Sequence, residues 1–316
     1  MAVLRIQLLG NVRVCWGDGS RELQVSGSAR ALLAYLLLQR HRSHPRSTLA
    51  GLLWGDHDDR RARSCLSTAV WRLRRQLEAG GAGGEDFLIS TPAGELRFNP
   101  GACYWLDVEA LEAGLAPTAR TPFAQWSPAE AEAAESCLGL YRGDLLEGFY
   151  DEWALRERER LRLLVLNGLV GLMRFHGYYG NYDRAAELGQ RVLVHDPLRE
   201  EIHRYLMRVY AESGQRPLAL QQYRTCAEAL RRHLGVEPME ETRALYARLA
   251  AAPAPEALAP ESSVGVRSLG QAVDLLRQAI DRFDRASSQL RHAVHLVERF
   301  SPPGSRGPSV AKRTTG

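Results

Sequence analysis

The sequence predicts an α+β winged helix-turn-helix domain, then an all-α domain of tetratricopeptide-like helical repeats, and finally a C-terminal amphipathic helix. Three observations predict this order. Strand patterns, a basic amphipathic helix and a hairpin pattern follow one another in residues 1–107. A turn motif recurs after 34 residues in the middle of the chain. A heptad pattern then follows a segment that is rich in Ala and Pro.

The first domain begins with short strands. Apolar residues alternate along 3–9 and 12–16, and a Gly-Asp-Gly turn at 17–19 reverses the chain. We expect Leu23 and Val25 to continue this sheet, because both are apolar and are spaced two residues apart.

Two helices are predicted next. Ser28 can cap the first helix, and residues 48–54 form a short apolar second helix. His41 and His44 lie in the arginine-rich break between them, with no Cys or carboxylate at ligand spacing. We therefore interpret both histidines as surface residues rather than metal ligands.

The third helix decides the functional prediction. Asp58 or Asp59 can cap it, and its pattern continues to about residue 77. One face is an apolar stripe, formed by Leu66, Val70, Leu73 and Leu77. The opposite face carries hydroxyls near the start and arginines further along, namely Ser64, Thr68, Trp71 and Arg75, flanked by Arg63, Ser67, Arg72 and Arg74.

This face suits a helix that lies in a DNA major groove. Small polar residues allow close approach, and arginine can bind guanine through two hydrogen bonds or hold phosphate. Strand patterns at 87–90 and 96–98, separated by a Pro/Gly turn, complete a winged helix and place Arg97 near an adjacent phosphate or minor groove. An exposed arginine-rich face is often only solvated, so both interpretations stay open at this point.

The second domain, residues 108–252, has an almost entirely helical pattern from residue 128 onward. Gly180 and Gly214 begin the same turn into a helix. Their spacing of 34 residues is the tetratricopeptide period. Ala185 and Ala219 take the small-residue position at which paired helices touch. Arg231 stands where the second repeat would have its closing proline, so we expect that repeat to be irregular.

The remaining segments are a linker at 253–264, a helix at 265–300 and a disordered tail at 301–316. Within the helix, apolar residues alternate at three and four positions, which favours a parallel two-stranded coiled coil. The stripe consists of Val266, Leu269, Val273, Leu276, Ile280, Phe283, Leu290, Val294 and Val297, with Ser287 as a polar interruption. The alternative is a single helix that packs its stripe against the repeat domain.

Composition excludes several enzyme classes. The 316 residues contain 41 Lys+Arg and 37 Asp+Glu, and Lys312 is the only lysine. A P-loop, a kinase strand lysine and a Schiff-base lysine all need a lysine within a structured motif. No nucleophile–base pair, paired carboxylate or metal cluster occurs at a mechanistic spacing, so we expect no enzyme activity, cofactor or metal.

Neither a membrane span nor a disulfide framework is expected. No stretch approaches about 18 consecutive apolar residues, and the chain begins with a strand pattern rather than a signal peptide. The five cysteines include no Cys-x-x-Cys pair, which is typical of small buried side chains in a reducing compartment. The basic excess lies in the first domain, with 10 Arg and 3 acids from Arg30 to Arg75.

Several motifs resemble the Streptomyces antibiotic regulatory protein family in its short form. In the first domain they are Leu4-x-Ile6-x-Leu8-Leu9-Gly10, Ala31–Leu38, Leu49-Ala50-x-Leu52-Leu53-Trp54 and Arg72-Leu73-Arg74-Arg75-x-Leu77, joined by Tyr104–Val108. In the second domain they are Leu140–Phe149, Glu157-Arg158-x-Arg160-Leu161, Asp196–Glu201, Ala219-Leu220-x-x-Tyr223 and Leu234–Pro238. They cover about residues 1–250 in family order. The resemblance implies an OmpR-type winged helix followed by a bacterial transcriptional activation domain.

The leading hypothesis is a cytoplasmic, nucleoid-associated transcriptional activator. The resemblance implies binding to direct repeats in promoter DNA, recruitment of RNA polymerase holoenzyme, control of a secondary-metabolite cluster, and a homodimer on DNA. The competing hypothesis is a protein-interaction adaptor that does not bind DNA, because Trp71 is bulky on a face that must fit a groove.

Overall fold

A four-stranded sheet forms the N-terminal part of the computed structural model, which describes residues 3–17, 21–25, 27–78 and 87–251. Its strands are β1 (Leu4–Gln7), β2 (Arg13–Trp16), β3 (Arg21–Glu22) and β6 (Tyr104–Leu106), in the order β3-β2-β1-β6. β1 is antiparallel to β2 and parallel to β6. The parallel pairing places two segments almost a hundred residues apart side by side.

The third strand is shorter than predicted and ends earlier in the sequence. Leu23 and Val25 do not continue the ladder, because β3 ends at Glu22. The Leu23 N–H still donates to the Val14 carbonyl at 2.7 Å, and Val25 is buried as the chain turns into the first helix. Val25 is therefore buried, and Leu23 half-buried, outside the strand ladder.

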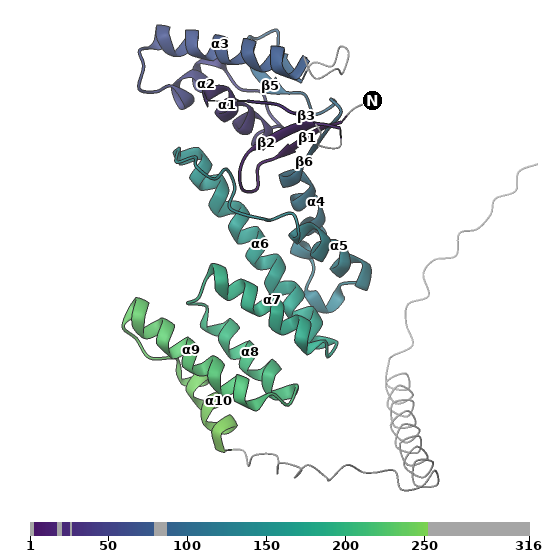
Figure 1. Ribbon diagram of the computed structural model, residues 1–316, viewed down its shortest axis with the longest axis vertical. Helices are drawn as coiled ribbons and strands as arrows, with labels where there is room; N and C mark the ends of the chain where they lie inside the picture. The colour runs from purple at the N-terminus through teal and green to yellow at the C-terminus, as the bar shows by residue number, and fades with distance from the viewer. Residues whose placement is uncertain (1–2, 18–20, 26, 79–86, 252–316) are drawn as a thin grey trace, which may run out of the picture. The chain divides into compact units, whose positions relative to one another are not determined.

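Three helices and a hairpin complete the winged helix. They are α1 (Gly27–Leu38), α2 (Arg46–Leu53), α3 (Asp59–Glu78), β4 (Leu88–Ser90) and β5 (Leu96–Phe98). Helix α1 packs against α2, α3 and β5. Figure 1 shows α3 along one end of the described unit, with α1 and α2 beside it. This order confirms the winged helix-turn-helix predicted from the sequence.

The interpretation of His44 as a surface residue is wrong. Its side chain is 4% exposed, and its ring lies 5.1 Å from the Tyr35 ring in an edge-to-face contact. Its backbone exchanges hydrogen bonds with that of Leu96. The segment between α1 and α2 therefore pairs with strand β5 of the wing. Burial lowers the pKa of His44. His41 is exposed, as predicted.

The named elements of the second domain are all helices. Its elements are α4 (Asp107–Arg120), the short 3₁₀ helix η1 (Phe123–Gln125), α5 (Pro128–Leu138), α6 (Glu152–Tyr178), α7 (Tyr182–His195), α8 (Glu200–Glu212), α9 (Arg216–Leu234) and α10 (Glu240–Ala251). The pairs α6–α7 and α8–α9 pack closely, and α10 lies against α8 and α9 (Figure 1). The stack of helix pairs confirms the predicted repeat architecture.

The two repeats have the same turn. Gly180 and Gly214 adopt left-handed φ angles of +77° and +78°, which favour glycine. The residue after each glycine donates its N–H to a carbonyl five positions earlier, at 2.8 Å for Asn181 and 2.7 Å for Gln215. The geometry thus repeats with the period of the sequence.

The packing between paired helices also repeats, but the ends of the repeats differ. Ala185 and Ala219 are both fully buried at the predicted helix contact. Helix α7 ends just before Pro197, whereas α9 continues past Arg231 to Leu234. The missing proline therefore lets the second repeat extend by about one turn.

The chain divides into a unit of residues 1–251 and a remainder of residues 252–316. The predicted linker at 253–264, the coiled-coil helix at 265–300 and the tail at 301–316 lie outside the described residues. None of the five cysteines forms a disulfide; Cys137 and Cys226 are buried, and the other three are half-buried. Among the described residues, no helix is both long and apolar enough to cross a membrane.

Candidate nucleic-acid interface

Helix α3 is fixed by its cap and its apolar stripe. The Asp58 carboxylate accepts the Arg61 N–H at 3.0 Å, so Asp58 caps the helix as the sequence suggested. The stripe of Leu66, Val70, Leu73 and Leu77 is buried, with at most 4% of each side chain exposed. Because this stripe faces the core, the opposite face of the helix must point outward.

The outward face carries most of the predicted DNA-contacting residues. The exposed residues are Arg63, Ser64, Ser67, Thr68, Trp71, Arg72 and Arg75. The hydroxyls of Ser67 and Thr68 donate to carbonyls one turn earlier, at 2.9 and 3.0 Å, which leaves their oxygens able to accept. These short side chains lie close to the helix and allow another surface to approach the backbone.

Trp71 protrudes from the middle of this face. Its side chain is 58% exposed, and the Arg75 guanidinium carbon lies 5.4 Å from the ring centroid. This cation–π contact orients Arg75 without neutralising its charge. The arrangement leaves the guanidinium N–H groups available to an external acceptor.

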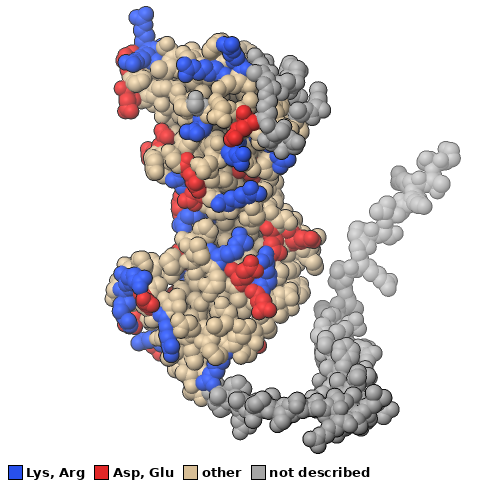
Figure 2. Space-filling model, viewed as in Figure 1, with Lys and Arg blue, Asp and Glu red and all other residues tan. Residues whose placement is uncertain are grey.

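The arginines of α3 have no acidic partners among the described residues. The helix contains Arg60, Arg61, Arg63, Arg72, Arg74 and Arg75, and none of them forms an ion pair there. In Figure 2, blue side chains recur along the end of the unit that α3 occupies. The positive charge of this end is therefore not neutralised within the described structure, which favours an anionic partner.

Arg74 has a different position from its neighbours. It is half-buried, and its guanidinium donates to the Leu88 carbonyl at 3.0 Å and the Ser90 hydroxyl at 3.1 Å. It therefore joins the third helix to the first strand of the wing. Arg97, on the second wing strand opposite Ile89, is also half-buried, and its Nε has no hydrogen-bond partner in the structure.

Sequence reasoning missed Arg46 as part of this surface. Arg46 is the first residue of α2, and its guanidinium lies 3.5 Å from the Ser67 hydroxyl of α3. The signal was present, because Arg46 follows Pro45 and lies in the arginine-rich stretch. Only the crossing of the two helices shows that it borders the same face.

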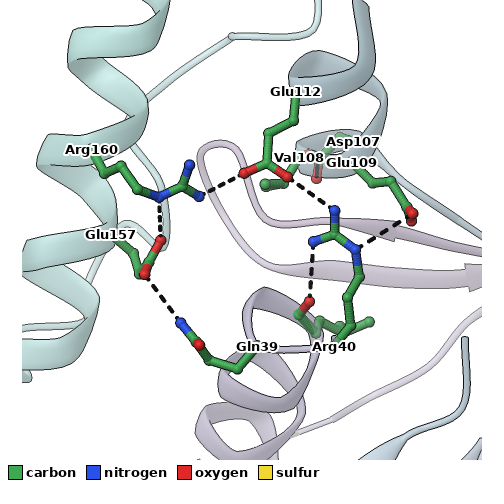
Figure 3. A network of polar contacts seen from close by, with 9 residues as sticks. Gln39, Arg40, Asp107, Val108, Glu109, Glu112, Glu157 and Arg160 are labelled. Carbon is green, nitrogen blue, oxygen red and sulfur yellow. Dashed lines mark hydrogen bonds and ion pairs between the residues drawn. The ribbon is translucent and has the colours of Figure 1, made fainter. Parts of the chain in front are cut away.

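A polar network attaches the winged helix to the second domain (Figure 3). Arg40, two residues after the end of α1, is 6% exposed and lies 3.4 Å from Glu109 and 3.0 Å from Glu112 of α4. Arg160 of α6 binds Glu112 at 2.6 Å and Glu157 at 2.7 Å. The turn after α1 thus shares one set of charges with helices α4 and α6 of the second domain.

Gln39 extends this network from α1 to α6. Its amide donates to Glu157 at 3.1 Å. Nearby, Tyr35 packs edge-to-face on Trp153 with ring centroids 5.3 Å apart. Apolar and charged contacts both cross this junction, and the winged helix and the repeat domain belong to one compact unit.

A loop of the second domain also completes the first sheet. Leu145 forms an antiparallel bridge with Leu9, and the Leu146 N–H donates to the Leu8 carbonyl at 2.8 Å. Arg158 holds this loop by donating to the carbonyls of Leu145, Leu146 and Phe149 at 2.7–2.9 Å. The contacts explain why the Leu140–Phe149 motif occurs with the winged-helix motifs in the same chain.

The described residues offer little other chemistry. They contain no group of three or more His, Cys, Asp or Glu side chains that could hold a metal ion. Asp107 is buried, but its carboxylate accepts the N–H groups of Leu8 and Leu9 at about 2.9–3.0 Å and so has a structural role. Burial raises the pKa of this carboxyl.

Comparison with known families agrees with this geometry. Residues 20–94 match the family model described as transcriptional regulatory protein, C terminal, and residues 106–250 match the bacterial transcriptional activator domain. The regulatory protein AfsR of Streptomyces coelicolor is 30% identical over 262 residues, which cover 78% of this chain and 24% of AfsR. The chain belongs to the Streptomyces antibiotic regulatory protein family. It spans about a quarter of the length of AfsR.

Two further proteins are similar to this chain. The transcriptional regulatory protein MoaR1 of Mycobacterium tuberculosis is 28% identical over 224 residues, covering 70% of this chain and 71% of MoaR1. The structure of Mycobacterium tuberculosis EmbR in complex with a low affinity phosphopeptide aligns with a TM-score of 0.61 and 24% identity, covering 79% of this chain and 65% of EmbR. At that identity EmbR shows the fold alone. The chain thus has, in this order, the two domains that the family models describe.

Proposed function

We propose that this regulator is a sequence-specific DNA-binding activator that inserts α3 into the major groove of promoter DNA. The observation that carries the proposal is the outward face of α3, where arginines without acidic partners among the described residues lie beside small hydroxyl side chains. A helix of this composition, backed by a wing, fits the dimensions of the groove.

The residues of this face have separate roles in the proposal. Arg72 and Arg75 bind base edges or phosphate near the centre of the helix, and Ser64, Ser67 and Thr68 line the approach. Arg63 and the wing residue Arg97 hold the flanking backbone. Trp71 presses on a thymine methyl group or a sugar, an apolar contact that offsets its bulk.

The repeat domain would then contact RNA polymerase holoenzyme. Its attachment to α1 through Arg40 and Arg160 supports this division of roles, because a surface fixed to the DNA-binding helix has a defined position on the promoter. Membership of the family supports direct-repeat sites upstream of a secondary-metabolite cluster. The protein would act in the cytoplasm on the nucleoid.

The experiment is a titration of promoter DNA from the neighbouring gene cluster, followed by fluorescence anisotropy at several salt concentrations. We expect Arg72→Ala/Arg75→Ala to weaken binding by about tenfold or more and to reduce the salt slope by about one to two. The matched control is Arg208→Ala/Arg224→Ala, which removes two exposed arginines from the repeat domain. If wild type and Arg72→Ala/Arg75→Ala bind equally weakly at every salt concentration, α3 does not read DNA and the adaptor hypothesis replaces this one.

Dimerisation is a separate proposal that rests on the heptad stripe of residues 266–297. The β-branched residues at one heptad position and leucines at the other favour a two-stranded parallel coil. Light scattering of the full chain against a chain that ends at Ala252 tests it. A dimer mass for the full chain alone supports the coil, and a monomer mass for both contradicts it.

A further inference from the structure

A cavity of about 480 Å³ lies within the second domain between α4, η1 and α6. Its walls are mainly apolar and include Leu115 of α4, Phe123 and Trp126 around η1, and Leu164 and Val170 of α6. The volume falls within the range of sites that enclose small organic molecules. It lies apart from the α3 face and contains none of the residues proposed to contact DNA.

Two glycines of α6 shape this cavity. A Cβ atom at Gly171 would overlap the Trp126 ring, and one at Gly168 would come within 3.0 Å of a Leu115 methyl group. The Trp126 ring is further fixed because its Nε1 donates to the Thr121 carbonyl at 2.9 Å. It also stacks on Phe175 with ring centroids 6.2 Å apart. The Trp126 wall is therefore held in place by Thr121, which also lines the cavity, and by Phe175 outside it.

A cation lies at the edge of these apolar walls. Arg174 lines the cavity, is exposed, and has no ion pair or hydrogen bond among the described residues. The other arginines of the same helix all have acidic or carbonyl partners, namely Arg156, Arg158, Arg160 and Arg162. Asn167 and Thr118 add neutral polar groups to the lining.

We propose that this cavity binds a small organic molecule with a largely apolar body and one anionic group. The apolar body would contact Leu115, Trp126 and Val170, and the anionic group would receive hydrogen bonds from the Arg174 guanidinium. The site does not depend on DNA binding. Because the ligand would contact both α4 and α6, its binding would stabilise the folded chain.

The test uses two fluorescent dyes with the same aromatic body, anilinonaphthalene sulfonate and neutral phenylnaphthylamine, titrated into the full chain. We expect Arg174→Gln to weaken the sulfonate dye about tenfold and to leave the neutral dye unchanged. Arg208→Gln is the matched control, since it removes an exposed arginine of α8, and it should change neither affinity. The sulfonate dye should also raise the unfolding temperature of wild type more than that of Arg174→Gln.

Substitutions that fill the cavity provide a second test. Val170→Trp should weaken both dyes, and Ala119→Trp, at the exposed edge of the same cavity, should do so without changing the core. Circular dichroism checks that each variant is folded. The proposal is overturned if Arg174→Gln affects the sulfonate dye no more than Arg208→Gln does, or if both dyes bind the folded filled variants as tightly as wild type.

Discussion

Helices α3 and α6 are both rich in arginine, but most of the arginines of the two helices differ in their acidic partners. On α6, Arg156, Arg160 and Arg162 each pair with a glutamate three or four residues away on the same helix. On α3, the six arginines have no such partner among the described residues. Arginine content alone therefore does not distinguish a binding face from a solvated one, whereas the presence or absence of neighbouring acids does.

The difference has a physical basis. An exposed pair such as Arg156–Glu152 contributes little to stability, but it leaves no net charge to attract a distant anion. Exposed arginines without acidic partners contribute little to folding and maintain a positive potential near the helix. Four variants with progressively smaller expected effects on stability test how these environments differ.

Arg40→Ala should have the largest effect on stability. Its guanidinium is almost completely buried between Glu109 and Glu112, so removal leaves partly buried carboxylates without their partner. We expect a loss of about 2–4 kcal/mol in the free energy of unfolding. Urea denaturation measures it, with Arg156→Ala as the exposed control, which should lose less than about 0.5 kcal/mol. Equal losses in the two variants would contradict the structural role assigned to Arg40.

Arg74→Lys separates a structural arginine from a DNA-contacting one. A lysine keeps the charge but cannot reproduce two hydrogen bonds to Leu88 and Ser90 from a planar group. We expect a loss of about 1–2 kcal/mol in stability and weaker DNA binding, similar to those of Arg74→Ala. The measurements are urea denaturation and the anisotropy titration. If the lysine variant binds DNA like wild type while alanine does not, Arg74 contacts phosphate instead.

His203 is a buried titratable side chain whose hydrogen-bond partners are both uncharged. Its ring is 1% exposed and lies 3.0 Å from the Pro197 carbonyl and 2.7 Å from the Gln222 amide. Burial lowers its pKa below the ordinary value of 6.5, so the unfolded chain binds more protons and stability falls as the pH drops below that value. Urea denaturation at about pH 7.5 and about pH 5.5 should show a smaller acid loss for His203→Gln than for wild type. An unchanged acid loss would assign the effect to other groups, His44 among them.

Arg72→Ala/Arg75→Ala should have the smallest effect on stability. Both side chains are exposed, and the Arg75 contact with Trp71 is their one ring interaction in the described structure. We expect a change within about 0.5 kcal/mol in urea denaturation. Together with the loss of DNA affinity expected above, this result would separate binding from folding on α3. A large destabilisation would instead mean that these arginines support the fold.

Much of the fold was predictable because it is encoded locally. The stripe from Leu66 to Leu77, the cap at Asp58 and the repeated turn at Gly180 and Gly214 each follow from a short-range pattern. The helix and its outward face could therefore be assigned from periodicity alone. The identity of the residues on that face was equally accessible.

What the sequence did not reveal depends on distant pairing. Nothing near Tyr104 indicates that β6 pairs with β1, and nothing near His44 indicates its bond to Leu96. Arg74 and Arg40 belong to patterns that look exposed, yet neighbouring elements cover them. Periodicity describes which face of an element is apolar, but it does not say which other element will cover the polar one.

The parallel pairing of β1 with β6 has a consequence for how the chain is made. Leu4–Gln7 is synthesised well before Tyr104–Leu106, so one of its edges stays open until Tyr104–Leu106 has left the ribosome. The N-terminal strand must wait for about a hundred residues of translation before Asp107 can accept the N–H groups of Leu8 and Leu9. Such a long separation between partners slows folding, so the winged helix closes only as the repeat domain begins to emerge.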